Sequence, residues 1–177
     1  MSVSVFKNII SSALIKNEIK FNNSNYKGGC FLIMYDVLLI AKYIIKYCNK
    51  SNFPISNLKL QKLLYFIQAA FLVEKEHACF PDEIEAWDFG PVVPAVYYKY
   101  KIYGGTNIPY INNNESFSVI ISQEDKDIIN RIINDCEKYT ASMLVDITHK
   151  QTPWLNAYAP YMRNIIAKDS IIEFFKE

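Results

Sequence analysis

Few side chains in this sequence combine the residue type and the spacing that catalysis requires. His149 lies four residues before Pro153, and a small hydrolase could pair this imidazole with a carboxylate or with Cys136. The sequence carries no G-x-S-x-G nucleophile motif to support that pairing. At the C-terminal turn of a helix, the helix dipole would favour a charged imidazole. We therefore predict a capping or packing role for His149 and keep the hydrolase as an alternative.

The sequence offers no complete metal or phosphate site. His77 and Cys79 could supply two metal ligands, but structural zinc almost always takes four, and no second pair occurs at finger-like spacing. Glu83 and Glu85 would share one face of a strand, as exposed carboxylates commonly do. Residues 104–106 lack the spacing and the lysine of a phosphate-binding loop and are interpreted as a helix stop. We predict neither a metal ion nor a cofactor.

Composition limits the remaining function classes. The chain has 177 residues, and its 19 basic and 18 acidic side chains give a net charge of +1, so nucleic acid is an unfavoured partner. With 51% hydrophobic residues, one domain of this length can bury a dense core. The four cysteines are widely spaced and form no C-x-x-C pair, which indicates a reduced, cytoplasmic chain. Every apolar run is far shorter than the roughly 20 residues that cross a bilayer.

The first 33 residues differ from the rest. Apolar residues recur at helical spacing from Val5 to about Ile19, and polar residues and glycines at 22–29 then end the pattern. This segment is interpreted either as an amphipathic helix or as a start-site artefact, with translation beginning at Met34. We favour the artefact and predict a single domain over residues 34–177.

The elements expected from residue 34 onward are mainly helical. Apolar stripes, N-cap residues and proline positions predict helices over 36–50, 56–75, 94–104, 122–139 and 140–150, a short helix from 152 and a terminal turn at 170–175. Alternation predicts a strand at 84–87 and a small hairpin, or two extended strands, at 108–111 and 116–121. The expected fold is mainly α (α+β), a compact helical domain with a small β-hairpin or short strands.

Several ordered motifs lie on these elements. They are Leu58-Lys59-Leu60-Gln61-Lys62-Leu63-Leu64-Tyr65-Phe66, Ala86-Trp87, Gly90-Pro91-Val92-Val93-Pro94, Val96-Tyr97, Tyr100, Gly104, Thr148-His149 and Pro153-Trp154. Taken in this order, they resemble the Panacea domain, a family of SocA-like antitoxins earlier catalogued as phage-associated GepA-like proteins. The resemblance runs from about Met34 to Phe175.

The resemblance implies an antitoxin and not an enzyme. A Panacea protein is encoded beside a small toxin and neutralises it, usually in a direct protein complex of the type II kind, while the SocA-like branch presents its toxin to the ClpXP protease. The family's toxins are unrelated to one another, so the domain does not reveal the toxin. A DNA-binding regulator using the row Lys42, Lys46 and Lys50 is an alternative of another class, and the near-neutral charge disfavours it.

Nine residues in or beside these motifs are candidates for contact with a partner, although each also has a structural interpretation. They are Lys59, Gln61, Lys62, Trp87, Pro91, Tyr97, Tyr98, His149 and Trp154. Lys59 and Lys62 are expected on a solvated face, and the Gln61 amide is expected to bond within the fold. Trp87, Pro91 and Tyr97 would lock a strand onto a helix, with Gly90 in an unusual backbone conformation. Tyr98 departs from the buried stripe and is expected to be exposed.

Overall fold

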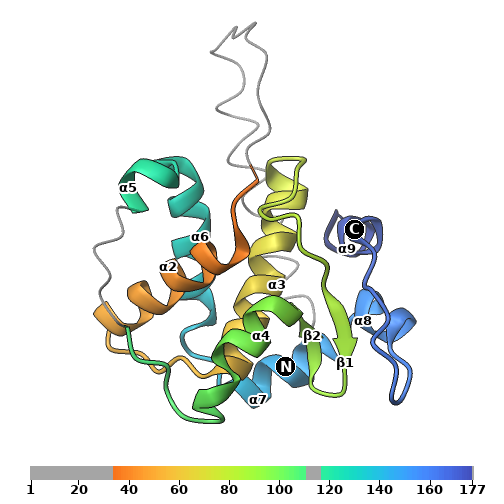
Figure 1. Cartoon of the computed structure of the whole chain (residues 1–177). Helices are drawn as coiled ribbons and strands as arrows, with labels where there is room; N and C mark the ends of the chain where they lie inside the picture. The colour runs from red at the N-terminus through yellow and green to blue at the C-terminus, as the bar shows by residue number, and fades with distance from the viewer. Residues whose placement is uncertain (1–33, 111–116, 177) are drawn as a thin grey trace, which may run out of the picture.

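The computed structural model describes residues 34–110 and 117–176 and is mainly helical, with one small sheet (Figure 1). Its elements, in chain order, are α2 (Val37–Lys50), α3 (Asn57–Glu74), β1 (Glu85–Trp87), β2 (Gly90–Val92), α4 (Pro94–Tyr100), the 3₁₀ turn η2 (Lys101–Tyr103), α5 (Phe117–Ile120), α6 (Gln123–Cys136), α7 (Ala141–Thr148), α8 (Thr152–Ala157) and α9 (Lys168–Lys176). The expected fold class, mainly α with a minor β part, is confirmed.

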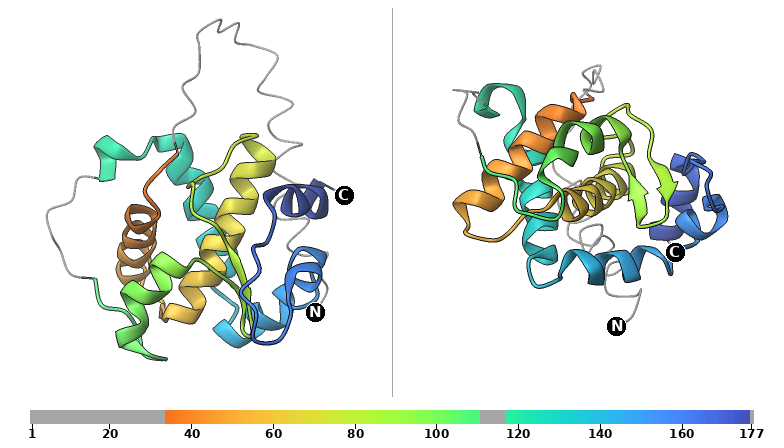
Figure 2. Two further views of the ribbon diagram at one scale, coloured as in Figure 1. Left: turned by 45° about the vertical axis from the view of Figure 1, so that its right-hand side comes forward. Right: turned by 60° about the horizontal axis from the view of Figure 1, so that its bottom comes forward.

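Helix α3 is the centre of the domain. In both views of Figure 2 the other elements surround it, and it contacts α2, α4, α6, α7, α9 and β2. It begins at the expected N-cap, where the Ser56 side chain accepts a hydrogen bond from the Lys59 amide. Almost every side chain from Asn57 to Val73 is buried, and Leu58 is partly exposed. A helix buried on all sides lies in the interior of a bundle.

The prediction that Lys59 and Lys62 occupy a solvated face is therefore wrong. Lys62 is fully buried and Lys59 is 7% exposed. The Lys59 ammonium donates to the Glu137 backbone oxygen at 3.2 Å and lies 6.0 Å from the ring of Phe53. The apolar stripe of α3 suggested one buried side, but helices and the hairpin cover the opposite side as well. Tertiary packing thus decides the burial of these lysines.

The outer helices α2 and α6 follow their sequence pattern. Each begins at a side-chain cap, with Asp36 accepting from the Leu39 amide and Ser122 accepting from the Asp125 amide. Their predicted apolar stripes are buried. The two helices are also joined by tyrosine hydroxyls, one of which donates from Tyr43 to the Asn130 side chain at 2.9 Å. Local pattern and observed packing agree here.

The sheet is a two-stranded antiparallel hairpin in which Ala86 faces Pro91 and Trp87 faces Gly90. The strand predicted at 84–87 is confirmed within one residue, whereas its partner β2 was not predicted. The outer edge of β1 is covered, because the Ala86 amide donates to the Asn164 oxygen at 2.9 Å. This pairing places the loop after α8, residues 158–167, beside the hairpin.

The prediction of a small hairpin, or of two extended strands, at 108–111 and 116–121 is wrong. Phe117–Ile120 forms the short helix α5, residues 108–110 are not in a strand, and residues 111–116 lie outside the described part of the chain. The helical turn brings Phe117 and Ile121 to the same side, and both are buried. The Phe117 ring packs edge-on against Tyr43 at 5.6 Å. Packing against α2 selects the helix over the alternating pattern.

The remaining boundaries are close to those expected. Helix α4 begins at Pro94, and the 3₁₀ turn after it ends at Gly104, where φ is +53°. Helix α9 begins two residues before the predicted turn at 170–175. The amphipathic helix considered for residues 5–19 lies outside the described ranges. Within those ranges, no helix is both long and apolar enough to cross a membrane.

Candidate functional site

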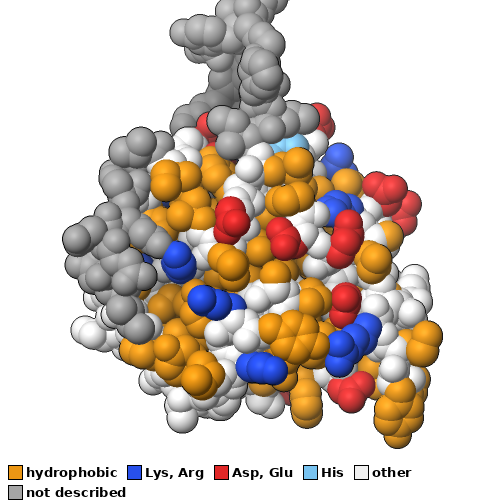
Figure 3. Space-filling model, in the orientation of Figure 1, with side chains coloured by type: hydrophobic (Ala, Val, Ile, Leu, Met, Phe, Trp, Pro, Cys, Tyr) orange, Lys and Arg blue, Asp and Glu red, His pale blue; other side chains and the backbone are white. Residues whose placement is uncertain are grey.

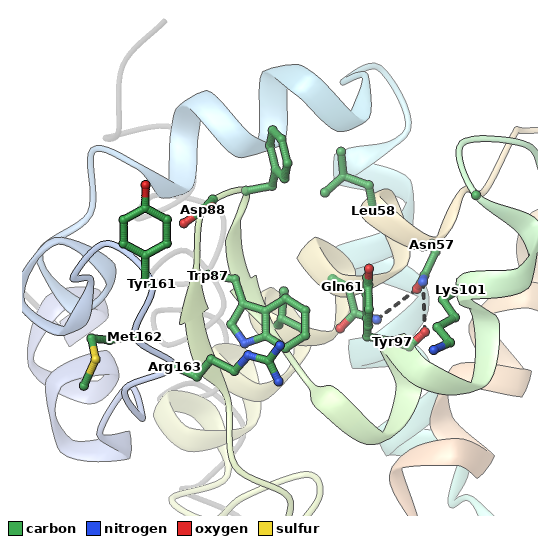
Figure 4. A pocket seen from close by; sticks show the side chains of 13 residues that line it. Asn57, Leu58, Gln61, Trp87, Asp88, Tyr97, Lys101, Tyr161, Met162 and Arg163 are labelled. Atoms are coloured by element: carbon green, nitrogen blue, oxygen red, sulfur yellow. Dashed lines mark hydrogen bonds between the residues drawn. The ribbon is translucent and has the colours of Figure 1, made fainter.

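A groove of about 620 Å³ lies between the hairpin, the start of α3, helix α4 and the loop 158–167 (Figure 4). Its lining residues are Asn57, Leu58, Gln61, Trp87, Asp88, Phe89, Val92, Tyr97, Lys101, Gly104, Tyr161, Met162 and Arg163. Elements distant in the sequence therefore meet at one surface. Its size lies in the range of sites that accept several side chains or a small ligand.

Buried amides of α3 fix one side of this groove. Gln61 accepts a hydrogen bond from the Val93 amide at 2.8 Å and donates to the Asn57 side chain at 3.1 Å. Asn57 in turn donates to the Tyr97 backbone oxygen at 3.1 Å. The expectation that the Gln61 amide bonds within the fold is confirmed. These bonds hold the start of α4 against α3.

Lys62 supports the hairpin from beneath. Its ammonium donates to the Pro91 backbone oxygen at 2.8 Å, and burial lowers the pKa of Lys62 to about 7. The close approach depends on Gly90, whose φ is +92°, because a Cβ there would lie 2.8 Å from the Lys62 nitrogen and 2.7 Å from the Thr148 hydroxyl. The predicted unusual backbone conformation of Gly90 is confirmed.

An aromatic stack ties the C-terminal part of the chain to the hairpin. The His149 ring lies parallel to that of Trp154 at 3.9 Å, and Trp154 stacks on Tyr158 at 4.5 Å. The Trp154 indole donates to the Trp87 backbone oxygen at 3.1 Å, and the Tyr158 hydroxyl donates to Asp88 at 3.1 Å. His149 is the C-cap residue of α7, as expected for a packing role.

The pKa of His149 shifts in the direction opposite to that expected for a helix C-terminus. Burial and the nearby Lys62 ammonium lower the pKa of the imidazole, although Asp146 and the backbone of Asp88 act in the opposite direction. Burial is the largest of these effects, so the neutral imidazole is favoured. The Cys136 thiol is fully buried and burial raises its pKa, whereas a cysteine nucleophile needs a lowered one. These properties disfavour the hydrolase alternative.

The exposed side of the groove is aromatic and apolar. Trp87 is half-buried, its indole donates to Glu85 at 2.7 Å, and its ring packs edge-on against Tyr97 at 4.8 Å. The rim carries Phe89, 68% exposed, and Met162, 57% exposed. Figure 3 shows apolar side chains interspersed with charged ones on the face that carries the hairpin and the loop 158–167.

Tyr161 is the extreme case on this rim. Its side chain is 100% exposed, and its backbone is in the left-handed region, with φ of +64°. A non-glycine residue in this region is strained, and such strain concentrates at functional sites. Sequence reasoning missed Phe89, Tyr161, Met162 and Arg163, since all four are in turns or irregular segments without periodicity. The signal available was a cluster of large apolar residues between Pro160 and the start of α9.

The nine residues predicted as partner contacts separate into two groups. Gln61, Trp87 and Tyr97 line the groove, and Tyr98 lies beside it, 47% exposed as expected. The other five are buried or half-buried and do not line the groove: Lys59, Lys62, Pro91, His149 and Trp154. Within 34–110 and 117–176, no group of three or more His, Cys, Asp or Glu side chains is placed to hold a metal ion.

Comparison with known proteins identifies the family. The family described as "Antitoxin SocA-like, Panacea domain" matches residues 60–155. Antitoxin SocA of Caulobacter vibrioides is 34% identical over 131 residues, which cover 67% of this chain and 68% of SocA. No solved structure matches the chain significantly. The chain belongs to the SocA-like Panacea-domain antitoxin family.

Proposed function

We propose that this protein neutralises a cognate protein toxin by binding it directly, through the groove and its rim. The observation that carries the proposal is an exposed aromatic and apolar rim on a member of an antitoxin family. Aromatic residues and methionine are enriched at protein interfaces, and large apolar side chains left exposed together mark binding surfaces. Phe89, Tyr161 and Met162 supply such side chains around the groove.

The proposed antitoxin acts in the cytoplasm, by binding and without catalysis. Antitoxin family membership supports this role, and so do the buried Cys136 thiol and the stacked His149 ring, which leave the hydrolase hypothesis without an activated nucleophile. The DNA-binding alternative has little support. The ammonium of Lys46 lies 4.9 Å from the ring of Phe117, and the net charge of the chain is +1.

Co-expression tests the proposal. The small reading frame beside this gene should arrest growth when expressed alone and should be harmless when expressed with this protein. The two purified proteins should then elute together in size-exclusion chromatography. A reading frame that is harmless when expressed alone, or that remains toxic when expressed with this protein, would contradict the proposal.

Delivery of the toxin to the ClpXP protease is a second candidate, which the resemblance to the SocA-like branch implies and the 34% identity to SocA favours. The two routes differ in the fate of the toxin. Direct neutralisation predicts the same toxin half-life in cells with and without ClpXP. The adaptor route predicts that this protein shortens the toxin half-life only when ClpXP is present.

A further inference from the structure

Two cations at the groove lack acidic partners. The Arg163 guanidinium lies 4.7 Å from the centre of the Trp87 ring, and the Lys101 ammonium lies 5.1 Å from the centre of the Tyr98 ring. Neither has a carboxylate within ion-pair distance in the described part of the chain. Lys75, Arg131 and Lys168, by contrast, are ion-paired elsewhere in the domain, and the Lys168 ammonium lies 3.1 Å from a carboxylate oxygen of Glu83. The groove therefore presents two positively charged side chains that can bind a carboxylate of a partner.

Arg163 is held in a defined orientation before any partner arrives. Its guanidinium stacks on Trp87 (Figure 4), and one terminal nitrogen donates to the Tyr98 hydroxyl at 2.9 Å. A guanidinium has five N–H donors, so the remaining ones can bind a carboxylate through two parallel hydrogen bonds. Trp87 is itself fixed by its hydrogen bond to Glu85. This arrangement lowers the entropy that binding would cost.

The side chains around Arg163 indicate which residues would lie beside a carboxylate bound there. Met162 precedes it in the same loop, Phe89 lies on the hairpin turn, and Leu58 lines the groove from α3. A carboxylate bound at Arg163 would therefore be flanked by apolar side chains. Asp88 lines the same groove, so a nucleic acid, which carries a charge at every phosphate, is disfavoured more than a segment that places a single carboxylate at Arg163.

We propose that the groove is a receptor for an acidic and apolar segment of the toxin, in which one Asp or Glu carboxylate binds Arg163 and neighbouring apolar side chains contact Phe89, Tyr161 and Met162. This inference rests on the proposed antitoxin function and adds the chemistry of the bound segment. Lys101, whose ammonium lies 5.1 Å from the centre of the Tyr98 ring, supplies a second positive charge beside the same tyrosine.

Binding of the purified toxin to variants of the full chain tests the inference. Arg163→Glu should weaken binding by about 30-fold or more, the effect of losing an interface hot spot. Arg163→Lys keeps the charge but loses the planar fork, and we expect a loss of about 5- to 10-fold. Lys176→Glu makes the same kind of charge change at an exposed position of α9 away from the groove, and it should stay within about twofold of the wild type.

The outcomes separate this inference from the proposed function. If the wild type binds the toxin and Arg163→Glu binds equally well, the inference is overturned and the antitoxin function stands. If the wild type does not bind the toxin, the proposed function fails first. A toxin substitution of one Asp or Glu by Arg that restores binding to Arg163→Glu would identify the acid. Competition by a single-stranded oligonucleotide that depends on Arg163 would overturn the inference in favour of nucleic acid.

Discussion

The hairpin is supported from one side and exposed on the other, and the two sides differ in chemistry. The hairpin support comprises Gln61, Lys62, Gly90, His149 and Trp154, which are buried or half-buried and closely packed. The groove rim comprises Phe89, Tyr161, Met162 and Arg163, which are all exposed. Every residue of the hairpin support lies within the 60–155 family match, whereas three of the four rim residues lie beyond it. The part that identifies the family positions the groove, and a different segment completes it.

Under the proposed function, this division allows the hairpin support to stay the same while the rim is adapted to the partner. The hairpin support holds the hairpin in place against α3 and α8. It does so through hydrogen bonds to backbone atoms, such as those from Lys62 to Pro91 and from Trp154 to Trp87. Those bonds do not depend on what binds outside. The rim side chains are exposed, and substitutions at exposed positions usually change stability little, so these side chains can differ at little cost. We expect substitutions in the support to change folding and substitutions in the rim to change binding.

The largest expected effect on stability is that of Trp154→Ala. This change removes a buried indole, two ring stacks and the hydrogen bond to the Trp87 oxygen. It should lower the free energy of unfolding by about 3–5 kcal/mol. Urea denaturation measures the loss. Leu155→Ala, at the next position but 50% exposed, is the matched control and should stay within about 0.5 kcal/mol of the wild type. Equal losses would contradict the comparison.

Gly90→Ala should have the next largest effect. The new methyl group would lie 2.7 Å from the Thr148 hydroxyl and 2.8 Å from the Lys62 nitrogen, at a backbone φ of +92° that L-residues rarely adopt. Overpacking of this kind costs about 1–3 kcal/mol, and the backbone strain adds to it. Gly105→Ala is the control, because no atom lies within 4 Å of its Cβ position. The urea midpoint should shift more for Gly90→Ala than for Gly105→Ala. Equal shifts would show that Lys62 and Thr148 do not pack closely against Gly90.

Because Lys62 is buried, we expect the free energy of unfolding to depend on pH. Burial lowers the pKa of Lys62 to about 7, whereas in the unfolded chain it is about 10.4. Between these values the unfolded state binds more protons than the native state, so stability rises with pH, by up to about 1.4 kcal/mol per pH unit. The stability gained at high pH is therefore lost as the pH falls through the native pKa of about 7. Lys62→Met removes the titrating group.

The test of this prediction is a difference measurement. Urea unfolding of the wild type and of Lys62→Met should be compared at about pH 7.5, 8.5 and 9.5. The wild type should gain stability relative to the variant as the pH rises. His149 does not interfere, since its pKa lies below the usual value and its ring is neutral in this range. A constant difference across the range would mean that Lys62 is not desolvated by the hairpin.

The sequence was sufficient for elements that local chemistry determines. Helix starts at Ser56, Ser122 and Thr140 were predicted because each side chain caps the amide three residues on, and all three caps are present. Stripes in α2 and α6 predicted their buried faces, since each helix has one solvated side. Burial of Lys62 was not predictable in this way, because it depends on packing around the whole of α3.

The rim residues could not be predicted from the sequence for a related reason. Tyr161, Met162 and Arg163 follow Pro160 in a segment with no period of 2 or 3.6, so no face could be assigned to them. Their place beside Phe89 depends on the pairing of Ala86 with Asn164, two residues 78 positions apart in the sequence. Strand β2 was missed likewise, since Gly90 and Pro91 favour a bend until Ala86 pairs with Pro91. Non-local pairing forms the site.

The smallest expected effect on stability belongs to Tyr161→Ala. The side chain is fully exposed, so its removal should change the free energy of unfolding by less than about 0.5 kcal/mol. Alanine keeps the left-handed backbone constraint, so any loss of toxin binding reports the missing ring and not a relaxed loop. We expect that loss to reach about tenfold or more in titration calorimetry. A variant that unfolds as readily as Trp154→Ala would place Tyr161 with the support, and the division between the two sides of the hairpin would fail.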